Sequence, residues 1–156
     1  MRIRIVAVGL KPPQWVKDAV DDYSNRFSPE VKLSWHEVKA ATRGPSQSAA
    51  KWMQIEAQAI EQVIPARSHV VVLDEHGDDL TTRALATRME RWRHSGVETS
   101  ILIGGPDGLD PALKNKAPEK IRLSSLTLPH AMVRVLLIEQ LFRAWSVMHN
   151  HPYHRD

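Results

Sequence analysis

Cysteine is absent from the 156 residues of this sequence, so disulfide scaffolds and thiolate metal sites are excluded. Long apolar runs are also missing, because no stretch approaches the roughly 20 residues that a membrane-spanning helix needs. The N-terminus has only a short apolar segment before Gly9 and Pro12 and lacks the cleavage site of a signal peptide. We therefore interpret it as a first strand, and we expect a cytoplasmic protein that does not bind membranes.

Excess charge of one sign is small, since the net charge is only +3. The surplus lies in the second half: residues 79–156 contain 11 Lys and Arg against 8 Asp and Glu, whereas residues 1–78 contain 10 of each. Five of the eight histidines also lie in the second half. A mildly basic half suits an anionic partner such as RNA, although a basic face is more often only a solvated surface.

Apolar spacing predicts strands that alternate with helices along the whole chain. Strands are expected at residues 2–8, 31–36, 70–73, 100–103 and 121–123. A helix is expected to open at Pro12 and Pro13, a second to hold Trp52 to Val63, and a third to follow a cap at Thr81 or Thr82. Asp110 is expected to cap a short fourth helix, and Pro129 to begin the last one. In the second helix, one inner face is predicted to hold Trp52, Ile55, Ala59, Ile60 and Val63. Because parallel strands need helix-length connections, this order predicts a single α/β domain, residues 1–156, with a mostly parallel sheet covered by helices.

Ligands of such sheets bind at the carboxyl ends of the strands, so the loops after Leu73, Ile103 and Leu123 are the places to examine. The loop after Ile103 has three glycines in five residues (Gly104–Gly108), which lets a ligand approach the backbone closely. It lacks the spacing of a dinucleotide-binding fingerprint and the lysine of a phosphate-binding loop. An ordinary strand-to-helix turn is the alternative interpretation.

Two further segments carry polar groups. Residues 121–130 hold three hydroxyls in four positions (Ser124, Ser125 and Thr127), which can bond a ligand or merely form turns and caps. The setting is not that of a nucleophilic serine. The tail, residues 149–155, gathers histidines with Tyr153 and Arg155. These side chains could stack on a base and contact phosphate, or they could form a structural cluster, whereas a metal site is disfavoured.

Four segments together resemble one family: Ile101–Gly108, Leu123–His130, Arg143–Ser146 and Asn150–Arg155. In this order and spacing they are similar to the RlmH family, bacterial SPOUT-class methyltransferases that modify N3 of a pseudouridine in large-subunit ribosomal RNA. The resemblance extends from Val6 to the end of the chain. It is weakest over residues 25–65, from which no functional residue is taken.

The resemblance implies an α/β fold with a C-terminal trefoil knot, with the knotted cofactor-binding region at roughly residues 70–156, and a homodimer. It also implies S-adenosylmethionine as the methyl donor and no metal. The cofactor-binding residues that it implies are Leu73, Gly104, Leu123, Ser124, Ser125, Leu126, Thr127 and Leu128. These positions lie at the three strand ends that the sheet argument selects.

For catalysis, we expect the tail residues Tyr153, His154 and Arg155 to position the substrate or take part in the reaction. N3 of the target must lose a proton, and His130 and His154 are the candidate bases, while Arg143 or Arg155 could lower the pKa of N3. The implied partner is ribosomal RNA in the assembled large subunit, and no DNA. The alternatives are a ribosome-binding factor that has lost its chemistry and a small nucleotide-binding phosphotransferase.

Overall fold

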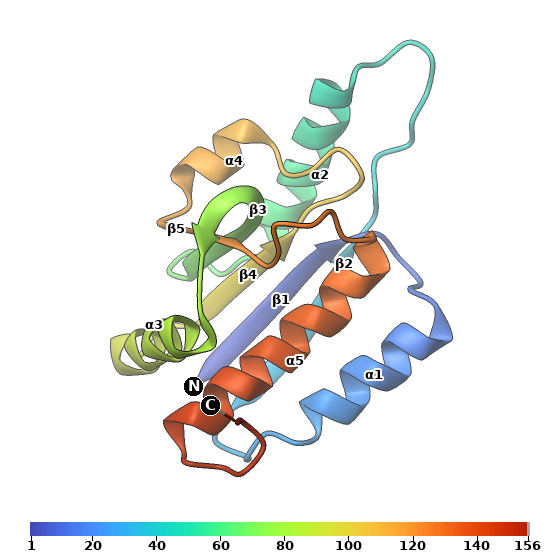
Figure 1. The fold of residues 1–156 in the computed structure, drawn as a ribbon. Helices are drawn as coiled ribbons and strands as arrows, with labels where there is room; N and C mark the ends of the chain where they lie inside the picture. Colours follow the sequence, from blue (N-terminus) through green and yellow to red (C-terminus); the bar gives the residue numbers. More distant parts are fainter. Residues whose placement is uncertain (156) are drawn as a thin grey trace.

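The computed structural model describes residues 1–155, and its centre is one five-stranded sheet (Figure 1). The strands are, in spatial order, β2 (Lys32–Val38), β1 (Arg2–Val8), β4 (Thr99–Ile103), β3 (His69–Asp79) and β5 (Glu119–Arg122). All four neighbouring pairs run parallel. The predicted α/β class with a parallel sheet is therefore confirmed.

Helices cover both faces of this sheet (Figure 1). On one face lie α1 (Gln14–Ser24), α3 (Thr82–Ser95) and α5 (His130–Met148), and on the other lie α2 (Ala49–Val63) and α4 (Pro111–Lys116). Successive side chains of a strand point to opposite faces. In β1, Ile3 and Ile5 accordingly pack toward the first group, and Val6 and Val8 toward the second.

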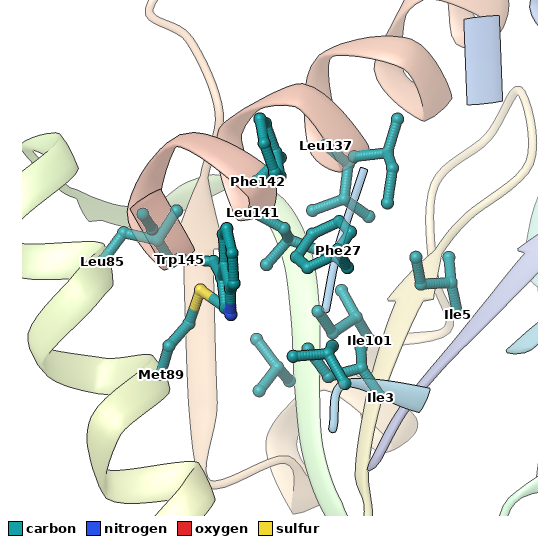
Figure 2. Close-up of a cluster of buried hydrophobic side chains, with 14 of the residues drawn as sticks. Ile3, Ile5, Phe27, Leu85, Met89, Ile101, Leu137, Leu141, Phe142 and Trp145 are labelled. Atoms are coloured by element: carbon teal, nitrogen blue, oxygen red, sulfur yellow. The ribbon is translucent and has the colours of Figure 1, made fainter. Parts of the chain in front are cut away.

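The larger core lies under α5, where Phe142 and Trp145 stack with ring centroids 5.5 Å apart (Figure 2). Phe27 meets Phe142 edge-on at 5.3 Å, and Met89 approaches from α3. This packing fixes α5 across the sheet, so its first residue, His130, lies at the carboxyl end of the strands and its last turn at the amino end (Figure 1).

Polar caps begin two helices where the sequence predicts them. The Thr81 hydroxyl accepts the amide hydrogen of Ala84 at the start of α3. At the start of α4, the Asp110 carboxylate accepts the amide hydrogens of Ala112 and Leu113. These bonds satisfy N–H groups that the first turn of a helix leaves unpaired.

The predicted inner face of α2 is wrong in part, because Ile55 is 38% exposed. The buried residues of this helix are Glu56, Ala57 and Ile60. A hydrogen bond to a loop backbone draws Glu56 inward and leaves Ile55 outside. Apolar spacing alone does not predict the buried face of a helix when a charged residue lies on that face.

Strand β3 is longer than predicted, since it continues past Leu73 to Asp79 and pairs with β5 again after an irregularity between Leu73 and Asp78. At Gly77, an added Cβ would lie 2.6 Å from the carbonyl carbon of Ile121. Glycine is thus required for the close approach of these two strands. Within residues 1–155, no helix is long and apolar enough to cross a bilayer.

Candidate functional site

A cavity of about 710 Å³ lies where the ends of β3, β4 and β5 meet the start of α5. Its volume is within the range of small-molecule sites, about 300–1,000 Å³. All eight residues predicted to bind the cofactor line this one cavity: Leu73, Gly104, Leu123, Ser124, Ser125, Leu126, Thr127 and Leu128. Segments 50 residues apart in the sequence thus form a common wall, and the binding role of these residues stays a prediction.

The turn Gly104–Gly108 forms one side of the cavity and is tightly closed. The amide of Gly108 donates to the carbonyl of Gly105 at 2.9 Å, and Gly108 has a left-handed φ of +84°. An added Cβ at Gly104 would lie 2.7 Å from the carbonyl carbon of Gly108 and 2.8 Å from the amide nitrogen of Leu109. Glycine at position 104 therefore permits backbone packing that no side chain allows.

Glu56 supports this turn from the side of α2. Its side chain is 2% exposed, and Oε1 accepts the amide hydrogen of Ala41 at 3.0 Å. A Cβ at Gly105 would lie 3.0 Å from Oε2, so the carboxylate occupies the space that a side chain there would need. Arg43 lies between two carboxylates, 2.5 Å from Asp107 of the turn and 3.5 Å from Glu56.

Sequence reasoning missed this support, because no functional residue was taken from positions 25–65. The available signal was the spacing of Trp52, Glu56 and Ile60, which places a carboxylate in line with apolar residues on α2. A buried charge needs a partner, and Arg43, in the loop before the helix, is that partner.

The segment 123–128 forms the opposite wall and exposes both backbone and apolar side chains. The Ser124 hydroxyl accepts the amide hydrogen of Leu126 at 2.9 Å, which bends the chain into a turn. Leu126 is 77% exposed, unusual for a large apolar side chain in a turn beside a cavity. Leu73, on the facing strand, is half-buried. Apolar surfaces from two segments thus border backbone polar groups, an arrangement suited to a flat ligand.

His130 lies at the base of the cavity, in the first turn of α5. Its Nε2 lies 2.8 Å from the carbonyl oxygen of Gly104 and donates to it, which leaves Nδ1 as the acceptor of the ring. Burial lowers the pKa of His130; the bond to Gly104 and the nearby Glu56 carboxylate oppose that effect, while the Arg134 guanidinium adds to it. The ring is therefore neutral at pH 7.

Arg134 fixes the same end of α5 to the sheet. Its side chain is 4% exposed and donates to the carbonyl of Gly9 and to the Glu37 carboxylate, each at 2.6 Å. A guanidinium buried to this degree is stable only when it is fully paired. The network joins the ends of β1 and β2 to the helix that carries His130.

The tail lies elsewhere, against the last turns of α5 at the opposite end of the sheet (Figure 1). The 19 residues of α5 separate it from the cavity by about 28 Å at 1.5 Å per residue. Tyr153 and His154 are half-buried there and Arg155 is exposed. The residues predicted to be catalytic are thus close to one another but not to the cavity of their own chain.

Tyr153 is held by a polar and aromatic cluster. Its hydroxyl donates to Glu139 at 2.9 Å and lies 3.2 Å from the hydroxyl of Tyr23, while its ring packs 4.8 Å from Phe142. Burial raises the pKa of Tyr153, and the Tyr23 and Glu139 contacts raise it further. The hydroxyl remains protonated at neutral pH and acts as a hydrogen-bond donor.

The other two tail histidines, His149 and His151, pack against aromatic rings of α5. His149 stacks on Trp145 at 4.6 Å, with Nδ1 2.9 Å from the carbonyl of that residue, and His151 lies 5.8 Å from the ring of Phe142. Across residues 1–155, no group of three His, Cys, Asp or Glu side chains is arranged to hold a metal ion.

Comparison with known proteins assigns this arrangement to a class. Residues 1–154 match the family described as "Predicted SPOUT methyltransferase", and the chain belongs to that family. It is 54% identical over 156 residues, all of both chains, to "Ribosomal RNA large subunit methyltransferase H" of Acidovorax sp. (strain JS42) and to the protein of the same name from Delftia acidovorans. The protein of that name from Ralstonia nicotianae is 52% identical over 99% of both chains. The resemblance predicted from the four segments is confirmed.

Proposed function

We propose that this methyltransferase uses S-adenosylmethionine to methylate N3 of a pseudouridine in 23S ribosomal RNA, acting in the cytoplasm on the assembled large subunit. The observation that carries the proposal is the single cavity lined by all eight predicted cofactor residues, in a chain that matches proteins named for ribosomal RNA methylation over their full length. The knot expected over roughly residues 70–156 is part of the proposal.

The cavity residues fit the methyl donor. Leu73, Leu126 and Leu128 offer apolar surfaces for the two faces of adenine, and the backbone of 123–128 offers N–H and C=O groups to its edge. We place the amino acid end near Gly104 and Gly105, whose backbone lines the cavity. When bound, S-adenosylmethionine supplies the methyl group and leaves as S-adenosylhomocysteine.

His130 is the residue of this chain best suited to take the N3 proton. Its Nε2–H is engaged by Gly104, its Nδ1 carries a lone pair, and its lowered pKa keeps that lone pair free at neutral pH. The proton moves to Nδ1 as the N3–carbon bond forms and the sulfur–carbon bond breaks. Loss of a general base costs about 10²–10⁴-fold in rate, so we expect His130→Gln to lower kcat by that factor.

The distance between tail and cavity supports a homodimer in which Tyr153, His154 and Arg155 act at the cavity of the partner subunit. In this arrangement the tail positions the RNA and places Arg155 near N3. His154 is then the alternative to His130 as the base. Large apolar side chains are available for a subunit interface near the start of α1, where Leu10 and Trp15 are 51% and 50% exposed.

Mass spectrometry of ribosomal RNA nucleosides from cells with and without this protein tests the activity. We expect methylated pseudouridine to disappear when the protein is absent, and its persistence would refute the assignment. Calorimetry with S-adenosylmethionine separates this reading from a ribosome-binding factor without chemistry, which would release no heat, and ATP is the comparison for a phosphotransferase. Equal methylation of naked RNA and of assembled subunits would refute the preference for the subunit.

Removal of residues 152–156 tests the tail separately. We expect methyl transfer to be lost and S-adenosylmethionine binding to be retained, because the cavity residues lie at the other end of α5. Full turnover by the truncated protein would remove the tail from the mechanism.

A further inference from the structure

We propose that a second cavity, next to the candidate functional site, binds the sugar–phosphate backbone of the RNA that flanks the target nucleotide. This inference rests on the proposed function. The second cavity, which we call the basic cavity, has a volume of about 530 Å³ and is lined by residues of β3, of α3 and of the start of β5. Its lining includes His69, His76, Arg88, Arg91 and Lys120.

The acidic groups of the basic cavity are already engaged in hydrogen bonds. Arg88 donates to Asp78 at 2.6 Å and to Glu119 at 3.2 Å, and these two are the carboxylates that line it. Glu119 also lies 2.8 Å from Nε2 of His69 and accepts from Nε1 of Trp92 at 3.0 Å. These bonds lower the pKa of Glu119 although burial raises it, so the carboxylate stays ionised and occupied.

Two cations of the basic cavity have no such partner. Among residues 1–155, no carboxylate lies within ion-pair distance of Arg91 or Lys120, although both line the cavity. Three fixed positive charges therefore face two negative ones, and the surplus belongs to side chains whose donors are free. Arg91 and Lys120 are therefore each available to contact one phosphate diester, which has one negative charge and oxygen acceptors.

The composition of the walls separates the two cavities by chemistry. The cavity of the candidate functional site is bordered by several leucines, whereas the apolar side chains that line the basic cavity are only Ala117 and Pro118. A flat base finds little apolar surface there, but a sugar and a phosphate find charged and polar donors. His76 lines both cavities, so they adjoin along the end of β3. A nucleotide presented to the first cavity would thus have neighbouring phosphates within reach of the second.

The test is the double variant Arg91→Gln/Lys120→Gln, which removes the unpaired charges and leaves the bonds of Arg88 in place. A matched control, Arg67→Gln/Lys32→Gln, removes one arginine and one lysine from exposed positions before β3 and at the start of β2. Neither control position lines either cavity. Thermal melting establishes that all variants are folded.

The first measurement is fluorescence anisotropy with a 12-nucleotide oligouridylate between 50 and 200 mM salt. Each phosphate contact contributes about 0.7 to the slope of log K against log salt for single strands, so the slope of Arg91→Gln/Lys120→Gln should be about 1.4 shallower than wild type. The ratio of wild-type to variant affinity should therefore fall about sevenfold between 50 and 200 mM salt. The control should shift by much less.

The second measurement is methyl transfer to ribosomal subunits from cells that lack the protein, with KM for subunits as the readout. We expect a higher KM for Arg91→Gln/Lys120→Gln and a wild-type value for the control. An unchanged slope and KM would overturn the inference. A raised KM with an unchanged slope would also overturn it, since the cavity would then contact a ribosomal protein. If the wild type neither binds S-adenosylmethionine nor transfers methyl groups, the proposed function fails, and the salt slope still decides the basic cavity.

Discussion

Gly104→Ala tests most directly how the glycine turn shapes the cavity of the candidate functional site. The new Cβ would lie 2.7 Å from the carbonyl carbon of Gly108 and 2.8 Å from the amide nitrogen of Leu109. Carbon atoms in contact prefer about 3.5 Å or more, so one backbone segment has to move by roughly 0.8 Å. Neither atom belongs to a side chain that could rotate away, and the movement therefore opens the turn.

Overpacking of this kind costs about 1–3 kcal/mol, and we expect the free energy of unfolding to fall by about 2 kcal/mol. Ligand binding requires the turn in its original position. Each 1.4 kcal/mol needed to restore it raises the Kd about tenfold, so we expect S-adenosylhomocysteine to bind at least about tenfold more weakly. Urea unfolding and isothermal titration calorimetry measure the two effects.

Gly44→Ala is the matched control, because an added Cβ there meets nothing within 4 Å and the backbone does not have a left-handed φ. Its stability should be unchanged or about 0.4–1 kcal/mol higher, through a less flexible unfolded chain. If Gly104→Ala equals Gly44→Ala in both stability and Kd, the close packing of the turn is not what shapes the cavity.

Three further substitutions probe the supports of the site. Glu56→Ala leaves the buried amide of Ala41 unpaired, so we expect about 2 kcal/mol lower stability in urea. Tyr153→Phe removes a donor to Glu139; we expect a loss of about 1 kcal/mol and unchanged S-adenosylmethionine binding in calorimetry. Burial raises the pKa of Glu119, but hydrogen bonds from three neighbouring donors lower it by more than burial raises it, so its net shift is downward. Its stabilisation is present above the ordinary value of 4.5 and is lost as the pH falls through the lowered value. Urea midpoints of the wild type and Glu119→Gln should differ at pH 7 and converge in acid.

Each of these predictions has a definite contrary result. Wild-type stability in Glu56→Ala would mean that the loop before α2 finds another acceptor. Weaker S-adenosylmethionine binding in Tyr153→Phe would contradict a tail that positions only the RNA. A difference between wild type and Glu119→Gln that persists in acid would show that packing, and not charge, connects β5 to α3.

Much of the architecture follows from local chemistry. The alternation of strands with capped helices predicts a parallel sheet, and the β1 and β4 segments read as strands from their apolar residues alone. The motifs at Ile101–Gly108 and Leu123–Leu128 point to the strand ends that line the cavity. Strand order and the buried face of α2 do not follow from the sequence, because each depends on partners that are distant along the chain. Glu56 illustrates this, since its burial makes sense only once Arg43 and Ala41 are beside it.

By itself, the sequence determined the element types, the three loops that meet at the candidate functional site and the family, since helix caps, apolar periods and short motifs are local properties. Tertiary structure alone decided that the tail folds back against the last turns of α5, because the contact of Tyr153 with Tyr23 joins residues that are 130 positions apart along the chain. It also decided that Arg88 pairs with both Asp78 and Glu119, leaving Arg91 and Lys120 unpaired among residues 1–155. Ion pairing depends on which charges the fold brings within a few ångströms, and no spacing rule along the chain fixes that.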